Sequence, residues 1–156
     1  MTELTRDSVK VSAAPSAVWA VIEDPTALAR VLPGAETLEP DGPGRWRGVL
    51  ASKIGFMTVR ADVVASLHDA EPPTHLRLEI EGRPRGLAGS FRASIPFDMT
   101  ALETSGREPG GTEIAYVVDM TVTGRLAAFG APLLRDTLRR QVVELVRNLE
   151  RELSSG

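Results

Sequence analysis

The C-terminal part of the chain has a hydrophobic pattern with a period of three to five residues. From residue 126 to residue 153, apolar side chains recur at these intervals, and charged side chains fill many of the positions between them. Such spacing keeps one apolar stripe on one face of a helix. No glycine or proline follows Pro132 within this stripe. We therefore predict one uninterrupted helix from Pro132 to Leu153, about 33 Å long at a rise of roughly 1.5 Å per residue.

Alternation of apolar and polar residues at every second position dominates the part of the chain before that helix. Such patterning between turn signals is typical of strands. It predicts strands over residues 8–12, 37–39, 45–54, 59–67, 75–81, 91–102 and 114–122. Pro96 predicts an edge position or a bulge in its strand, because proline cannot donate a ladder hydrogen bond. Residues 82–89, rich in Gly, Arg and Pro, are predicted to form a turn or an edge segment.

Two short helices are predicted between the first two strands. Pro15 suits the first turn of a helix that runs to Glu23, because a backbone N–H is not needed at that position. Asp24 can then cap a second helix, with Pro25 at its first position, that stops at Pro33-Gly34. Helices this short cannot fill a core alone, so we expect them to plug one end of the sheet.

Together these elements predict an α+β fold in which a curved, seven-stranded antiparallel sheet wraps around the long C-terminal helix. Strict alternation with short connections indicates an antiparallel sheet with one solvated face and one covered face. The 156 residues are enough for one domain, predicted to span residues 1–156. We expect a cavity between the sheet and the helix, and that cavity is the place to look for function.

Composition excludes several classes of function. The net charge of −3 argues against a general nucleic-acid binder. The absence of cysteine excludes disulfides, thiolate nucleophiles and zinc–thiolate sites. The N-terminus has no apolar segment typical of a signal peptide, and no apolar run approaches the roughly 20 residues of a membrane span. We expect a cytoplasmic protein whose membrane contact is at most peripheral, at the inner face of the membrane.

The predicted inner face of the sheet is poor in polar side chains. Only Ser52 and Tyr116 carry polar groups there, whereas His68 and His75 fall on the outward parity. General acid–base catalysis needs a titratable group within hydrogen-bond reach of the substrate. The sequence also lacks the Gly-x-Ser-x-Gly, His-Glu-x-x-His and Cys-x-x-Cys motifs. We therefore predict binding rather than catalysis, with no catalytic residue, metal or cofactor.

Three features have two interpretations. The large apolar side chains either line a ligand cavity or are ordinary core; these are Phe91, Phe97, Met99, Met120 and Phe129. Six arginines, at positions 125, 135, 139, 140, 147 and 151, form a docking surface for an acidic partner or an anionic lipid, or an ordinary solvated helix face. Gly130 is a hinge before the long helix, or simply marks its start.

Five short motifs resemble one known family. These are Val18-Trp19-Ala20, Asp24-Pro25, Leu32-Pro33-Gly34-Ala35-Glu36, Lys53-Ile54-Gly55 and Gly124-Arg125-Leu126-Ala127-Ala128-Phe129-Gly130. Their order is similar to that in the family of the carbon monoxide dehydrogenase G subunit (CoxG), over roughly residues 8–149. The resemblance implies the START-like (SRPBCC) helix-grip fold, also found in birch-pollen allergens, with a hydrophobic-ligand pocket between the sheet and the last helix. It also implies an accessory role for molybdenum-dependent dehydrogenases and related hydroxylases, linked to membrane recruitment and quinone handling.

Two departures from the family pattern affect these expectations. Many family members continue into an amphipathic tail, whereas this sequence ends at Ser154-Ser155-Gly156, and proline often follows the glycine that is Gly55 here. Phe56-Met57 stands in that place, so we expect these two residues to shape the pocket wall. The full predicted ligand-binding set is Leu32, Ile54, Phe56, Met57, Phe91, Phe97, Met99, Tyr116, Met120, Phe129 and Leu133.

The sequence thus predicts a non-enzymatic binder or carrier of a small hydrophobic ligand, quinone- or lipid-like, that serves a molybdenum-containing dehydrogenase. Two alternatives remain. The first is an enzyme of the polyketide cyclase or dehydratase type, which shares the fold and would use Tyr116 and Ser52 to orient its substrate. The second is an assembly or interaction module that acts through the Arg-rich face of the last helix.

Overall fold

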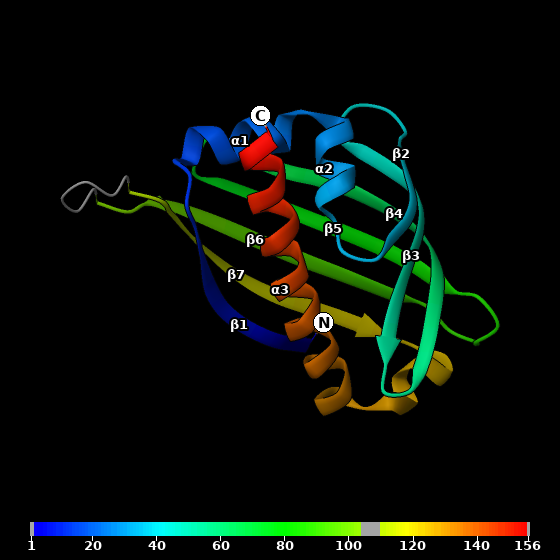
Figure 1. Cartoon of the computed structure of the whole chain (residues 1–156). Helices are drawn as coiled ribbons and strands as arrows, with labels where there is room; N and C mark the ends of the chain where they lie inside the picture. Colours follow the sequence, from blue (N-terminus) through cyan, green and yellow to red (C-terminus); the bar gives the residue numbers. More distant parts are fainter. Residues whose placement is uncertain (1, 104–109, 156) are drawn as a thin grey trace.

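One antiparallel sheet of seven strands forms the frame of the protein. The computed structural model describes residues 2–103 and 110–155. The strands are β1 (Thr2–Val11), β2 (Ala35–Pro40), β3 (Arg45–Ile54), β4 (Met57–Glu71), β5 (His75–Pro84), β6 (Phe91–Ala101) and β7 (Thr112–Val122). Their order across the sheet is β1-β7-β6-β5-β4-β3-β2. The sheet curves around the long helix α3 (Ala131–Ser155), which confirms the predicted α+β fold (Figure 1).

Two short helices follow β1, as predicted. Helix α1 spans Pro15–Glu23 and α2 spans Pro25–Val31. The Asp24 carboxylate accepts hydrogen bonds from the backbone N–H groups of Thr26 and Ala27, at 3.1 and 3.2 Å, so it caps α2. Both helices lie at the end of the sheet where α3 ends, and a 3₁₀ helix, η1 (Gly124–Phe129), lies at the opposite end (Figure 1).

The start of the C-terminal helix differs slightly from the prediction. Helix α3 begins at Ala131, so Pro132 is its second residue rather than its first. Gly130 has a positive φ of 82° and separates η1 from α3. Residues 124–129, which carry the first apolar positions of the stripe, therefore form a separate turn of helix. None of the helices in the described residues combines the length and the apolar character needed to cross a bilayer.

The predicted turn over residues 82–89 was wrong at its start, because β5 continues to Pro84. Gly82 pairs with Phe91 of β6, and a Cβ atom at position 82 would lie only 2.5 Å from the Phe91 ring. The missing side chain leaves room for that ring on the inner face of the strand. Glycine therefore marks a close side-chain approach here rather than a turn.

The expectation for Pro96 was also wrong. Strand β6 lies between β5 and β7, so Pro96 is not at a sheet edge. Pro96 faces Arg77 in β5. The register to β7 is the same before and after it, with Ser94 opposite Asp119 and Phe97 opposite Tyr116, so there is no bulge.

Three groups of buried side chains hold the helices on the sheet. At the α1 end, Val18 and Trp19 pack with Leu149 of α3. A second group surrounds Trp46 of β3, whose indole N–H donates to the Pro25 carbonyl oxygen at 2.9 Å. The third, at the opposite end, is Ile54, Val59 and Leu126. These contacts fix the ends of α3 and leave a space under its middle.

Candidate ligand-binding cavity

A cavity of about 250 Å³ lies between the inner face of the sheet and α3. Its wall consists of apolar side chains from all three helices, from η1 and from six of the seven strands. Among the described residues, only four polar side chains line it: Ser52, Tyr116, Thr137 and Gln141. The same described lining includes no charged side chain and no histidine. Its volume lies just below the roughly 300–1,000 Å³ typical of small-molecule sites, and its lining fits an apolar ligand.

The cross-strand register explains why this wall is apolar. Ile80, Ala93 and Met120 lie opposite one another on β5, β6 and β7. Leu76, Phe97 and Tyr116 form another such row. Because side chains in one cross-strand row share a face, both rows point toward α3. The apolar character of this wall therefore follows directly from the period-2 alternation of these strands.

Seven of the eleven predicted ligand-binding residues line the cavity. They are Leu32, Ile54, Phe91, Phe97, Met99, Tyr116 and Met120. Phe129 and Leu133 do not line it, but pack against the buried group of Ile54, Val59 and Leu126 at the η1 end. Phe129, at the end of η1, and Leu133, near the start of α3, therefore lie beside the cavity rather than in its wall.

The expectation for Phe56 and Met57 was wrong. Phe56 is fully exposed and half of Met57 is exposed. Gly55, with a φ of 62°, and Phe56 form the tight turn between β3 and β4, and Ile54 pairs with Met57 across it. Phe56 therefore lies in the turn beyond the end of the sheet, and Met57 belongs to the last residue pair of β3 and β4, so neither side chain is part of the cavity wall.

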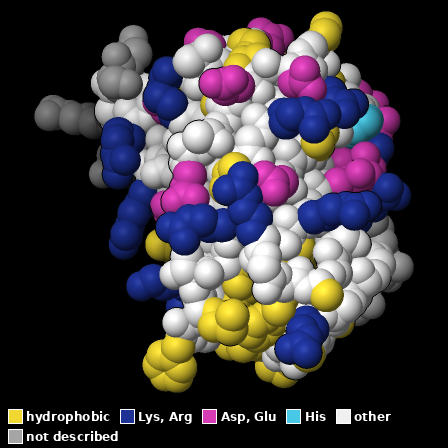
Figure 2. Space-filling model, turned by 90° about the vertical axis from the view of Figure 1, so that its right-hand side faces the viewer, with side chains coloured by type: hydrophobic (Ala, Val, Ile, Leu, Met, Phe, Trp, Pro, Cys, Tyr) yellow, Lys and Arg dark blue, Asp and Glu magenta, His cyan; other side chains and the backbone are white. Residues whose placement is uncertain are grey.

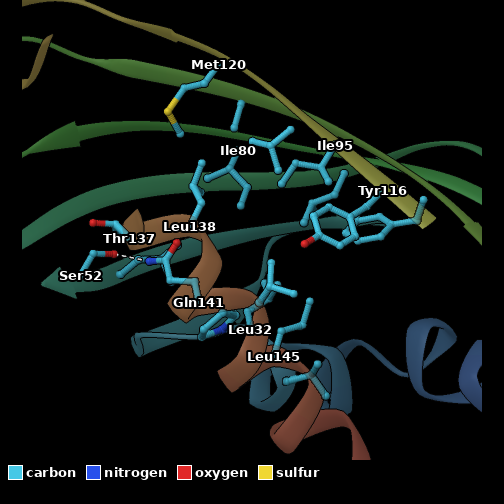
Figure 3. Close-up of a pocket in the computed structure, with 18 of the residues that line it drawn as sticks. Leu32, Ser52, Ile80, Ile95, Tyr116, Met120, Thr137, Leu138, Gln141 and Leu145 are labelled. Atoms are coloured by element: carbon cyan, nitrogen blue, oxygen red, sulfur yellow. Dashed lines mark hydrogen bonds between the residues drawn. The ribbon is translucent and has the colours of Figure 1, made fainter. Parts of the chain in front are cut away.

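Two polar residues of α3 were missed by the sequence analysis. The Gln141 side-chain amide donates a hydrogen bond to the Ser52 hydroxyl on β3. The Thr137 hydroxyl bonds the carbonyl oxygens of Leu133, at 3.1 Å, and Lys53, at 3.3 Å. These bonds fasten α3 to β3 along one side of the cavity (Figure 3). Gln141 lies three residues after Leu138 and four before Leu145, and Thr137 lies four before Gln141; this helical spacing is the signal that could have placed them on the cavity face.

Tyr116, on β7, supplies a hydroxyl group to another part of the cavity wall. Its ring packs against Phe97 with a centroid distance of 6.3 Å, and the residue is buried. Figure 3 shows the Tyr116 oxygen pointing into the space between the sheet and α3. Burial raises the pKa of Tyr116 above its ordinary value of 10.0, the charge of Asp7 raises it further, and Arg139 opposes the shift. Tyr116 therefore presents a neutral hydroxyl group to the cavity at neutral pH.

We expect the Tyr116 hydroxyl to titrate above pH 10.0, its ordinary pKa. Because the folded-state pKa is raised, the associated stability is complete below pH 10.0 and is lost as the pH rises through the folded value. The chain contains one tyrosine, so the tyrosinate absorbance reports this residue alone. A titration midpoint at or below pH 10.0 in the folded protein would contradict the assignment.

The two histidines lie on the outer face of the sheet, as the alternation predicts. His68 is 3.2 Å from Glu79 and also bonds Ser66, and His75 is 2.8 Å from Asp98. Neither histidine belongs to the cavity lining. Within residues 2–103 and 110–155, no three His, Asp or Glu side chains are placed to hold a metal ion.

The arginines of the C-terminal segment are not all solvated. Arg135 donates to the Leu4 carbonyl oxygen at 2.7 Å, and Arg140 donates to the Lys53 carbonyl oxygen at 3.2 Å. These two residues tie α3 to β1 and to β3. Of the six arginines only Arg135 is partly buried, and the other five, Arg140 included, are exposed. An interaction surface on this helix would therefore use a smaller set of arginines than the sequence suggested.

A comparison with protein families matches residues 8–154 to the family described as the G subunit of carbon monoxide dehydrogenase (CoxG). The chain belongs to this family. The match confirms the resemblance carried by the short motifs and extends over almost the whole chain. No curated protein matches the sequence.

Solved structures confirm the fold of this CoxG family member. A conserved protein from Geobacillus kaustophilus is 22% identical, with a TM-score of 0.80, over 95% of this chain and 93% of that chain. A protein from Thermus thermophilus, TTHA0849, is 18% identical, with a TM-score of 0.62, over 97% of each chain. The Zhui aromatase/cyclase from Streptomyces sp. R1128 is 15% identical, with a TM-score of 0.60, over 96% of this chain and 92% of that chain. These similarities show the SRPBCC-like fold, and together with the family they support a ligand-binding or carrier role.

Proposed function

We propose that this protein is a non-enzymatic carrier of a small hydrophobic ligand, quinone- or lipid-like. The observation that carries the proposal is the cavity under α3, whose lining has four polar side chains and no charged one. Hydrophobic burial is the main driving force for such a ligand, and its strength scales with the apolar area removed from water. A charged substrate would lose its hydration in this cavity without gaining an ionic partner.

The cavity lining also supports binding without catalysis. The Tyr116 hydroxyl, kept neutral by burial, is its only titratable group. An acid–base enzyme normally places a group with a pKa near the working pH beside its substrate. The likeness to an aromatase/cyclase concerns the fold, which hosts unrelated functions in different proteins.

We propose further that the carrier serves a molybdenum-containing dehydrogenase. The name of the family supports this partner, since it describes a subunit of carbon monoxide dehydrogenase. A redox-active quinone would be a suitable ligand for a carrier that serves such a dehydrogenase, because a quinone can accept the electrons that the dehydrogenase removes from its substrate. Co-purification of such a dehydrogenase with the tagged protein from its host would support the pairing, and its absence from such preparations would count against it.

The carrier proposal is tested by native mass spectrometry of the protein purified from its host. We expect a bound apolar molecule that organic solvent extracts. The emptied protein is then titrated with quinones and with long-chain lipids while tryptophan fluorescence is recorded, since both tryptophans pack beside the cavity. Purification without any ligand, together with no uptake of either class, would refute the proposal.

We also propose peripheral contact with a lipid surface through the β3–β4 turn. Hydrophobic side chains gather at the lower end of the molecule, the end at which this turn and η1 lie (Figures 1 and 2). Phe56 and Met57 project there, and neither Lys53 nor Arg125 has an ion-pair partner in the part of the chain that the structure describes. Exposed apolar side chains beside free cations are typical of surfaces that bind anionic membranes.

Replacing both Phe56 and Met57 by serine is expected to weaken binding to anionic vesicles at least about tenfold. Each apolar side chain contributes roughly 1.5–3 kcal/mol when it leaves water completely. Vesicle co-sedimentation measures the effect. Val143→Ser is the matched control, because Val143 is similarly exposed but lies on α3. Equal binding by the double variant and the control would refute contact through this turn.

A further inference from the structure

The four polar side chains of the cavity differ in their hydrogen bonding. Ser52 and Gln141 bond each other, and Thr137 bonds two backbone carbonyl oxygens. Tyr116 is the exception, because its hydroxyl group bonds no residue in the described parts of the chain. The first three side chains therefore serve to hold α3 on β3, whereas the Tyr116 hydroxyl has no structural role of this kind.

The position of the Tyr116 hydroxyl explains how it remains unpaired. Among the described residues, no completely buried side-chain nitrogen or oxygen lacks a hydrogen-bond partner. The Tyr116 oxygen therefore retains accessible surface, although the residue as a whole is buried. Since Tyr116 lines the cavity and its oxygen points into it, that surface is available to a bound molecule (Figure 3).

The sheet places this hydroxyl on a strand distant, in sheet order, from the one to which the other polar side chains bond. Tyr116 is on β7 and Ser52 is on β3, with three strands between them. At about 4.8 Å between neighbouring strands, the separation along the sheet is roughly 19 Å. Apolar cavity residues around Tyr116 include Phe97 and Val118. A ligand that fills this end of the cavity meets the unpaired Tyr116 hydroxyl among apolar side chains, with the charges of Asp7 and Arg139 close enough to affect its pKa.

We propose that Tyr116 selects ligands that carry a carbonyl oxygen, by donating its hydroxyl hydrogen to that oxygen inside the cavity. This inference rests on the proposed carrier function and names the polar group that its ligand must have. A hydrocarbon of the same shape would displace water from the hydroxyl and leave it unpaired, which is unfavourable in an apolar site. A carbonyl compound keeps the hydrogen bond. Tyr116 thus determines specificity, and the apolar wall supplies most of the affinity.

The charges around Tyr116 suit a donor role. Asp7 lies opposite Tyr116 on the neighbouring strand β1, and its negative charge disfavours a tyrosinate. Arg139 of α3 acts in the other direction, but the net effect keeps the proton on the oxygen. A protonated phenol donates its hydrogen to a carbonyl oxygen, which has lone pairs and no hydrogen of its own.

The test uses two probes with one carbon skeleton: 2-methyl-1,4-naphthoquinone and 2-methylnaphthalene. The absence of cysteine removes the thiol groups with which such quinones react. Dissociation constants are measured by calorimetric titration for the natural protein and for Tyr116→Phe. We expect the natural protein to prefer the quinone, and Tyr116→Phe to bind the quinone roughly 2- to 12-fold more weakly, the effect of one net hydrogen bond. The affinity for the hydrocarbon should stay the same or increase.

A second readout separates recognition from packing. With ring-labelled tyrosine, the single tyrosine gives one set of resonances. The carbon that bears the hydroxyl should shift when the quinone binds, and shift less with the hydrocarbon. Equal weakening of both probes by Tyr116→Phe would assign the residue a packing role and overturn the inference, as would unchanged quinone affinity. Binding of the hydrocarbon alone would overturn it while leaving the carrier function intact. Binding of neither probe would also overturn it, and the carrier function would then be decided separately by the native mass spectrometry and the lipid titration.

Discussion

Ala93→Phe is expected to reduce the affinity for the hydrophobic ligand at least about tenfold, which corresponds to roughly 1.4 kcal/mol. Ala93 lies on β6 between Ile80 and Met120, and it lines the cavity with a single methyl group. A phenyl ring in its place would occupy a large part of the space of about 250 Å³. Overpacking a filled core typically costs about 1–3 kcal/mol, but here the ring enters empty space. Ligand titration and denaturant unfolding measure the two effects separately.

The matched control for this change is Ala115→Phe. Ala115 lies on the adjacent strand β7, on the face that points away from α3, where it is opposite Ser8 and Asp98. The same substitution there adds the same ring to the outer surface, so we expect unchanged ligand affinity. If Ala93→Phe bound the ligand as well as the control does, the ligand would have to occupy another site.

Most of the fold could be predicted from the sequence because local signals and tertiary packing agree. Pro15, Asp24 and Pro25 have strong positional preferences at helix starts, and both short helices begin where these residues predict. Strict alternation predicted the buried face of each strand, because one face had to cover α3. The strand ends were less well defined, since β4 extends to Glu71 through residues whose side chains are exposed.

The incorrect predictions concern residues whose position depends on contacts with parts of the chain that are distant in the sequence. Gly82 signals a turn in the sequence, but the Phe91 ring uses the space that a side chain would fill. Phe56 is hydrophobic and follows a strand with an apolar face, yet the tight turn carries it beyond the sheet. Thr137 and Gln141 are polar residues whose partners lie on β3, more than eighty positions earlier in the chain. No local pattern contains these pairings.

The cavity itself could be expected from the sequence but not established by it. Alternation identifies which side chains point inward, and seven predicted residues do line the cavity. Whether the inward-facing side chains fill the space between the sheet and α3 depends on the distance between the helix and the sheet. That distance is set by the bonds of Gln141 and Thr137 to β3, and by those of Arg135 to β1 and Asn148 to the Val31 carbonyl oxygen. These polar contacts act together with the buried apolar groups at both ends of α3 to position the helix.

Trp46→Ala is expected to lower the free energy of unfolding by about 3–5 kcal/mol, the usual cost of removing a large buried aromatic side chain. Trp46 is only 2% exposed and packs against Leu28 and Leu32 of the α2 segment. Because those two residues also line the cavity, loosening this contact should weaken ligand binding as well. Urea unfolding with and without ligand measures both effects.

Trp46→Phe distinguishes packing from hydrogen bonding at the same position. Phenylalanine keeps most of the buried apolar surface but loses the indole N–H that donates to Pro25. We expect a loss of only about 1 kcal/mol from this single hydrogen bond. If Trp46→Phe were as destabilising as Trp46→Ala, the indole hydrogen bond would be what holds α2 against β3. The α2 wall of the cavity would then depend on that bond rather than on hydrophobic packing.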